Sequence, residues 1–146
     1  MSLPTMHGTG RLTADAEVRF SPNGTAVATV PLAFNARRYN RDTGQWEDGD
    51  VCFIRGTLFR DAAENAAETY KRGMEVVVTG RLKTEEWQDR ETGQKRSRVA
   101  LLIDAIGPST RYATATVRKA EPRESAAPGS SWPDVPAPGT VEEPPF

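Results

Sequence analysis

Aromatic and basic side chains alternate along residues 51–59, a stretch whose composition is typical of a β-strand. Successive side chains of a strand point to opposite faces. One face therefore receives small or aliphatic groups, namely Cys52, Ile54, Gly56 and Leu58. The opposite face receives Phe53, Arg55, Thr57 and Phe59. The first set suits a protein interior, whereas two rings on an outward face need an explanation.

Residues 75–83 repeat this arrangement. The inward positions are again small or aliphatic: Val76, Val78, Gly80 and Leu82. Arg81 and Lys83 point outward, and Trp87 does so too if the strand continues. Bases stack on aromatic side chains at about 1–3 kcal/mol each, and cations between the rings neutralise phosphates. The two stretches therefore predict a surface for a flexible nucleic-acid strand. The alternative is that the three rings Phe53, Phe59 and Trp87 pack in the core or at an oligomer interface.

A basic, aromatic segment lies between the second and third predicted strands. It contains Arg37, Arg38 and Tyr39, with Trp46 a few residues further on. We expect a projecting loop here that adds Arg37, Arg38 and Tyr39 to the same surface. A plain solvated hairpin would have a similar composition.

Five stretches have the length and composition of strands, and Gly-containing turns separate several of them. They are residues 7–12, 26–34, 51–59, 75–83 and 98–106. Residues 61–72 predict a helix between the third and fourth strands, with Asp61 as its N-cap and Gly73 as its stop signal. This order predicts an all-β fold with one helix. It is the order of the OB-fold, a five-stranded Greek-key barrel that commonly binds oligonucleotides or oligosaccharides.

Composition divides the 146-residue chain into a folded domain at residues 5–117 and a Pro-rich tail at 118–146. Seven of the eleven prolines follow Arg118, and the apolar residues there are isolated, which predicts disorder. The net charge of −1 hides an asymmetry, because residues 1–118 carry +2 and residues 119–146 carry −3.

The residue types for catalysis are sparse. The single histidine, His7, has no cysteine or acidic cluster near it in the sequence, and the single cysteine, Cys52, falls on an inward position. No glycine-rich phosphate loop follows a strand. We therefore expect no catalytic residues, no metal and no cofactor. The sequence contains neither a signal peptide nor an apolar run that would span a membrane, so we expect a cytoplasmic protein with no membrane partner.

Several segments in order resemble the bacterial single-stranded DNA-binding (SSB) family. They are GRLT at 10–13, EVRF at 17–20, PNGTAVA at 22–28, RDAAEN at 60–65, KRG at 71–73, VVVTGRLKT at 76–84 and IGPSTRYATA at 106–115. The resemblance covers about residues 7–116. It implies a nucleoid-associated OB-fold protomer, assembled as a homotetramer, that binds and protects single-stranded DNA in replication, recombination and repair. It also implies stacking positions at Tyr39, Phe53, Phe59 and Trp87.

Two features depart from the family pattern. Pro31 interrupts the second strand and predicts a bulge or an edge there. The tail ends in Glu142, Glu143, Pro144, Pro145 and Phe146, a tip with only two acids before its prolines. The resemblance implies that such a tip docks on replication and repair proteins, and an inert solubilising tail is the alternative.

Two other kinds of protein share this fold and pattern. An RNA-binding OB-fold module would prefer RNA over oligo-dT. A protein-interaction OB-fold module would use the same face for a protein partner and would lack DNA affinity.

Overall fold

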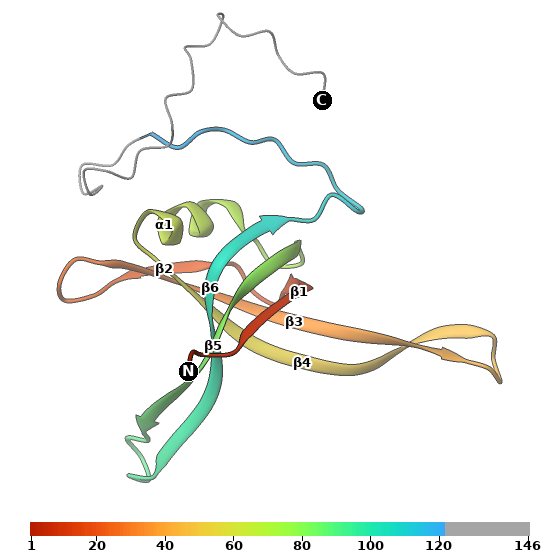
Figure 1. Cartoon of the computed structure of the whole chain (residues 1–146), viewed down its shortest axis with the longest axis horizontal. Coiled ribbons are helices and arrows are strands. Elements are labelled where there is room, and N and C mark those ends of the chain that lie inside the picture. Colours follow the sequence, from red (N-terminus) through yellow and green to blue (C-terminus); the bar gives the residue numbers. More distant parts are fainter. Residues whose placement is uncertain (122–146) are drawn as a thin grey trace, which may run out of the picture.

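Five strands close into a ring in the computed structural model, which describes residues 1–121 (Figure 1). The elements are β1 (Thr5–Leu12), β2 (Glu17–Phe20), β3 (Ala26–Asn40), β4 (Gln45–Phe59), α1 (Arg60–Thr69), β5 (Glu75–Gln88) and β6 (Lys95–Pro108). The hydrogen-bonded order is β1-β5-β6-β4-β3-β2, and β1 also pairs with β3, which closes the ring and leaves β2 outside it. The predicted OB-fold with one helix is confirmed. The short strand β2 was not predicted.

The barrel interior is built from alternate residues of the ring strands. The largest fully buried side chains are Val30, Leu32, Val76, Val78 and Leu101. Leu58 is buried as predicted, while the predicted inward residues Ile54 and Leu82 are half-buried against the same cluster. A Cβ atom at Gly80 would collide with the backbone carbonyl of Leu102, so only glycine fits at the irregularity in the β5–β6 register.

The helix is shorter than predicted and has a different cap. It spans Arg60–Thr69, its N-cap is Phe59 without a side-chain hydrogen bond, and Asp61 lies in the first turn instead. It ends early because Tyr70 turns into the core, where its ring is 6% exposed and its hydroxyl donates to the carbonyl of Ile106 at 3.1 Å. Burial raises the pKa of the Tyr70 hydroxyl above its usual value.

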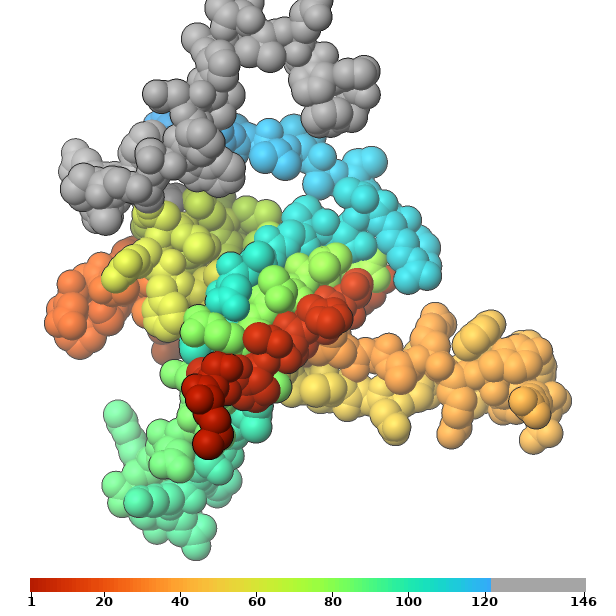
Figure 2. Space-filling model, in the orientation of Figure 1, coloured from red at the N-terminus to blue at the C-terminus, as the bar shows by residue number. Residues whose placement is uncertain are grey.

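Two hairpin arms extend beyond the predicted strands. β3 and β4 continue to a turn at residues 41–44, and β5 and β6 continue to a turn at 89–94. Residues 37–40, which were predicted as part of a loop, therefore belong to β3. The two arms leave the barrel in different directions and stand apart in the space-filling view (Figures 1 and 2).

Cys52 is exposed, so its predicted burial is wrong. It pairs with the half-buried Phe34 at the base of the β3–β4 arm. The barrel core ends between Gly56 and Cys52. Side chains of β4 still alternate between two faces beyond this point, but no interior is left to bury those on the inward face.

Pro31 lies where β3 changes neighbours. β2 pairs with β3 as far as Thr29, and β1 begins to pair at Leu32. The Pro31 carbonyl accepts a hydrogen bond from the Thr13 backbone N–H at 3.0 Å on that side. The irregularity in the pairing of β3 with β4 is between Asn35 and Arg37, so no bulge lies at Pro31. Pro31 instead lies at a short unpaired edge of β3, between the end of its pairing with β2 and the start of its pairing with β1.

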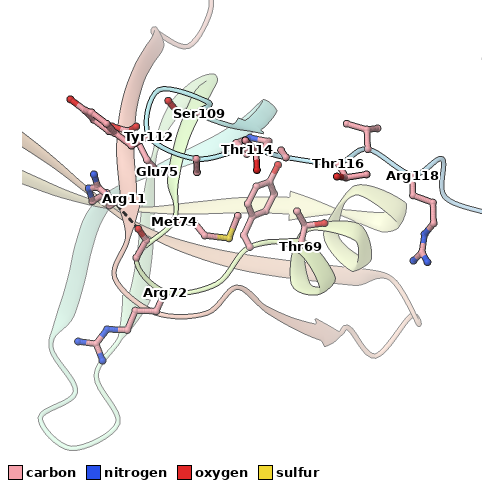
Figure 3. A pocket seen from close by; sticks show the side chains of 16 residues that line it. Arg11, Thr69, Arg72, Met74, Glu75, Ser109, Tyr112, Thr114, Thr116 and Arg118 are labelled. Carbon is pink, nitrogen blue, oxygen red and sulfur yellow. Dashed lines mark hydrogen bonds between the residues drawn. The ribbon is translucent and has the colours of Figure 1, made fainter. Parts of the chain in front are cut away.

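Residues 109–121 run back across the end of the barrel without regular secondary structure. The Ser109 backbone N–H donates to the carbonyl of Glu75 at 2.9 Å, and Arg118 forms an ion pair with Glu68 at 3.5 Å. A cavity of about 790 Å³ lies between this segment and the barrel, with Tyr70 and Met74 among its lining residues (Figure 3). Most of the predicted tail, from residue 122 onward, is outside the described residues.

The alternation along β4 predicts opposite effects for two substitutions. Leu58→Ala should lower the free energy of unfolding by about 2–5 kcal/mol, because Leu58 is 5% exposed in the core. Phe53→Ala should cost less than about 1 kcal/mol, because its ring is 71% exposed. Urea titrations at one protein concentration measure both, and equal losses would contradict the register.

Candidate nucleic-acid interface

The outer face of β4 carries two accessible rings. Phe53 is 71% exposed and Phe59 is 48% exposed, so the outward direction predicted for both is confirmed. Arg55 and Thr57 lie between them on the same face. Their partners on β3, which lie on that face as well, are all small or aliphatic: Ala33, Pro31, Thr29 and Val27. Short neighbours leave the ring faces uncovered.

The cations of this region differ in how they are paired. Arg81 donates from Nε and Nη2 to one carboxylate oxygen of Asp104, at 3.3 and 3.1 Å. Within residues 1–121, neither Arg55 nor Lys83 forms an ion pair or a side-chain hydrogen bond. Arg55 and Lys83 are therefore free to meet an anion, whereas Arg81 is already neutralised by a carboxylate.

Trp87 lies on the β5–β6 arm and is 41% exposed, which confirms the predicted continuation of its strand. It pairs with Arg96, while Glu85 pairs with Arg98. The guanidinium carbon of Arg98 lies 4.9 Å from the centroid of the Trp87 ring. A cation at this distance over an indole face is a cation–π contact.

The β3–β4 arm carries a pair of exposed rings near its tip. Tyr39 is opposite Trp46 in the register, and the ring centroids are 5.3 Å apart in an edge-to-face arrangement. Tyr39 is 49% exposed and Trp46 is 63% exposed. Arg37 is also exposed on this arm. The structure thus places Tyr39 and Arg37 on the arm, apart from the β4 row, which consists of Phe53, Arg55, Thr57 and Phe59.

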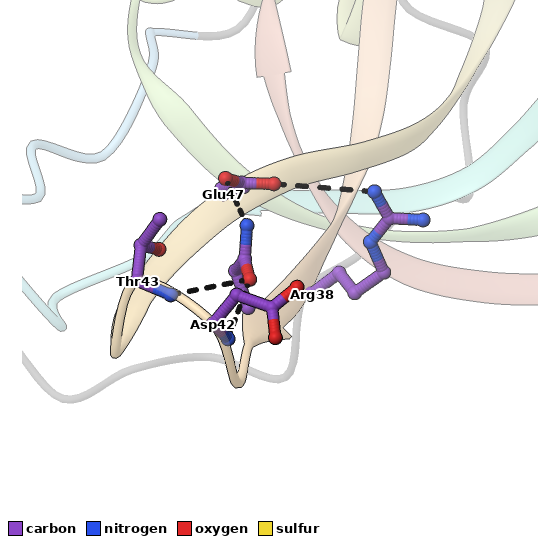
Figure 4. A network of polar contacts seen from close by, with 5 residues as sticks. Arg38, Asp42, Thr43 and Glu47 are labelled. Carbon is purple, nitrogen blue, oxygen red and sulfur yellow. Dashed lines mark hydrogen bonds and ion pairs between the residues drawn. The ribbon is translucent and has the colours of Figure 1, made fainter.

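A polar network holds the turn of this arm (Figure 4). The side-chain oxygen of Asn40 accepts from the backbone N–H of Asp42 at 2.9 Å and of Thr43 at 3.4 Å. The amide nitrogen of Asn40 donates to Glu47 at 2.8 Å, and Arg38 lies 3.9 Å from the other oxygen of Glu47. The network fixes the turn, and it places a carboxylate beside Arg38.

The described residues contain no group of three or more histidine, cysteine, aspartate or glutamate side chains placed to hold a metal ion. No helix among residues 1–121 is long and apolar enough to cross a membrane.

Comparisons with known proteins identify the family. The Single-strand binding protein family matches residues 5–109. The chain belongs to this family. A single-stranded DNA-binding protein of Mycobacterium tuberculosis (strain ATCC 25618 / H37Rv) is 43% identical over 155 aligned positions, which cover 94% of each chain. One from Mycobacterium leprae (strain TN) is 50% identical over 111 positions, covering 76% of this chain and 66% of that one.

The fold comparison agrees with the sequence comparison. The crystal structure of a small single-stranded DNA-binding protein from Streptomyces coelicolor superposes with a TM-score of 0.63 at 30% identity. It covers 75% of this chain and 97% of the other. The expectation of a non-enzymatic, single-stranded DNA-binding protein is confirmed at the level of the family.

Sequence reasoning left two residues unassigned that the structure places beside predicted ones. Trp46 had been noted only as a neighbour of the basic segment, and it contacts Tyr39 directly. Arg98 had been taken only as the first residue of a strand. Extending the hairpin symmetrically about its turn at residues 89–94 would have placed Arg98 opposite Glu85, next to Trp87.

The pairing of cations predicts opposite changes in salt dependence. Arg55→Ala should flatten the slope of log affinity against log salt for single-stranded DNA by about 0.7, because it removes one free cation. Asp104→Asn should steepen the slope by up to about 0.7, because it releases Arg81. Oligo-dT titrations at several salt concentrations measure both changes. If Asp104→Asn leaves the slope unchanged, the ion pair with Asp104 does not keep Arg81 from binding a phosphate.

Proposed function

We propose that this family member binds single-stranded DNA, with little sequence preference, by stacking bases on exposed rings and placing phosphates on nearby cations. The stacking residues are Tyr39, Phe53, Phe59 and Trp87. The cations are Arg37, Arg38, Arg55, Arg81 and Lys83. One observation carries the proposal: the unpaired Arg55 lies between two exposed phenylalanines whose β3 neighbours are short. Every base has a π-face, so such a surface tolerates any sequence.

The main alternatives fit this face less well. Rings that are 71% and 48% exposed in the protomer are not core residues. An oligomer interface centred on this row would bury the charge of Arg55, and charged residues are depleted at interface cores. An RNA-binding module would need contacts that favour the 2′-hydroxyl. Tighter binding of oligo-rU than of oligo-dT would support that alternative.

The stacking proposal predicts selective losses of affinity. Phe53→Ala and Phe59→Ala should each weaken oligo-dT binding by about 1–3 kcal/mol, which is roughly 5- to 150-fold. Phe20→Ala is the matched control, because Phe20 is also an exposed ring, at 62%. It pairs with the buried Ala26, and paired residues share a face, so Phe20 lies on the face of the sheet opposite to that of Phe53 and Phe59. Titrations followed by fluorescence anisotropy of a labelled oligonucleotide measure all three. Equal effects of Phe20→Ala and Phe53→Ala would contradict the proposal.

A homotetramer is part of the proposed function. The family resemblance supports it, and so does the exposure of Val77, which is 50% accessible on the outer face of β5. His7, Thr9 and Thr79 lie on the same face as Val77, according to the β1–β5 register. Sedimentation at micromolar concentration should give about four times the 16.0 kDa chain mass, and a monomer would contradict the assembly.

The tail tip, outside the described residues, is proposed to dock on replication and repair proteins. Glu142 and Glu143 would steer the tip to a basic rim, and Pro144, Pro145 and Phe146 would enter an apolar pocket. Deleting residues 142–146 should weaken the capture of such proteins and leave oligo-dT affinity within about twofold. Unchanged capture by the truncated chain would mean that the tail acts only as a solubilising segment.

A further inference from the structure

Trp87 differs from the other proposed stacking residues because a cation covers one of its faces. Arg98 lies over the indole at 4.9 Å from guanidinium carbon to ring centroid. Within residues 1–121, no cation lies over the rings of Tyr39, Phe53 or Phe59. The ring of Trp87 is still 41% exposed, so part of its surface remains accessible.

The position of Arg98 follows from the hairpin register. Arg98 is directly opposite Glu85 and diagonal to Trp87, whose own partner is Arg96. Diagonal positions in an antiparallel pair are about 7–8 Å apart, which a long side chain spans. The Nε of Arg98 donates to Oε2 of Glu85 at 3.2 Å. The guanidinium is therefore held at two points, by the carboxylate on one side and by the indole on the other.

The neighbouring cation is kept away by a separate partner. Arg96 forms an ion pair with Asp89 at 3.0 Å, near the turn of the arm. The arm thus has two arginine–carboxylate ion pairs, one across the strands and one to the turn, and only the cross-strand pair that contains Arg98 contacts the ring. This duplication provides an internal control.

We propose that Arg98, held by Glu85, is a positioning residue that fixes the indole of Trp87 with one face covered and the other free for a single base. The inference rests on the proposed function, since it assumes that Trp87 stacks on DNA. A guanidinium stacks on an aromatic face through its plane as well as its charge. Covering one face prevents two successive bases from sandwiching the ring, and it restricts the rotation of the indole before DNA arrives.

The competing role for Arg98 is that of a phosphate ligand that leaves Glu85 when DNA binds. The two roles differ in salt dependence. A phosphate ligand contributes about 0.7 to the log–log slope. A positioning residue that stays paired with Glu85 contributes nothing to that slope. Its removal instead changes the solvent accessibility of the Trp87 indole.

The test uses the full chain with Trp46→Phe and Trp132→Phe, so that Trp87 is the only one of the three tryptophans left. The variant Glu85→Gln with Arg98→Gln removes the ion pair at constant net charge. The matched control, Asp89→Asn with Arg96→Gln, removes the other ion pair of the arm. Thermal melts of both variants check that the fold is retained.

Without DNA, the Glu85→Gln, Arg98→Gln variant should increase acrylamide quenching of Trp87 on the order of twofold, because a second face becomes accessible. It should also weaken oligo-dT binding by about 2- to 5-fold, with an unchanged salt slope. The control variant should change none of these. Unchanged acrylamide quenching, unchanged oligo-dT affinity or a slope flattened by about 0.7 would each overturn the positioning role.

Trp87→Ala, made in the parent chain, separates the two proposals. If Trp87→Ala binds oligo-dT as tightly as the parent, Trp87 stacks no base. Both the stacking role proposed for Trp87 and the positioning role proposed for Arg98 are then wrong. If Trp87→Ala binds weakly while the Glu85→Gln, Arg98→Gln variant binds normally, only the role of Arg98 is wrong.

Discussion

The alternation of side chains along the barrel strands ties each exposed ring to a buried neighbour in the same strand. Phe59 points outward because Leu58 is held in the core, and the outward Val77 lies between the fully buried Val76 and Val78. A shift of one residue would exchange the two faces of a strand, and the burial of these aliphatic side chains opposes it. The candidate interface is therefore fixed by the stability of the barrel and needs few contacts of its own.

This dependence explains what the sequence predicted well and what it did not. The outward direction of Phe53 and Phe59 follows from the period of two, which can be read wherever a strand has one buried face, and that of Trp87 follows only by continuing the alternation of β5 into the arm. The lengths of the arms and the exposure of Cys52 could not be read in this way, because both faces of an arm meet water and no hydrophobic pattern marks its end. The helix boundary was wrong because the burial of Tyr70 overrode the local stop signal at Gly73.

Charge pairing was also inaccessible to sequence reasoning. Arg81 and Arg55 look equivalent in the alternation, but Asp104 comes to lie beside Arg81 only through the pairing of β5 with β6. Exposed ion pairs contribute little to stability. Under the proposed function, their larger effect would be to decide which cations are free to meet a phosphate, in a domain whose net charge is only weakly positive.

The arrangement of the arms gives a physical reason to expect selectivity for a single strand. The β3–β4 arm and the β5–β6 arm, which carries Trp87, leave the barrel in different directions (Figure 1). β4 and β6 pair only at Gly56 with Leu101 and Thr57 with Leu102, so the two arms separate directly beyond the barrel. A ligand that reaches Tyr39 and Trp46 on one arm and Trp87 on the other must change direction between the arms. Duplex DNA resists such bending, with a persistence length of about 50 nm, and its bases are already stacked on each other. A single strand bends easily and presents unpaired bases, so it can follow the curved surface and stack on both arms at lower cost.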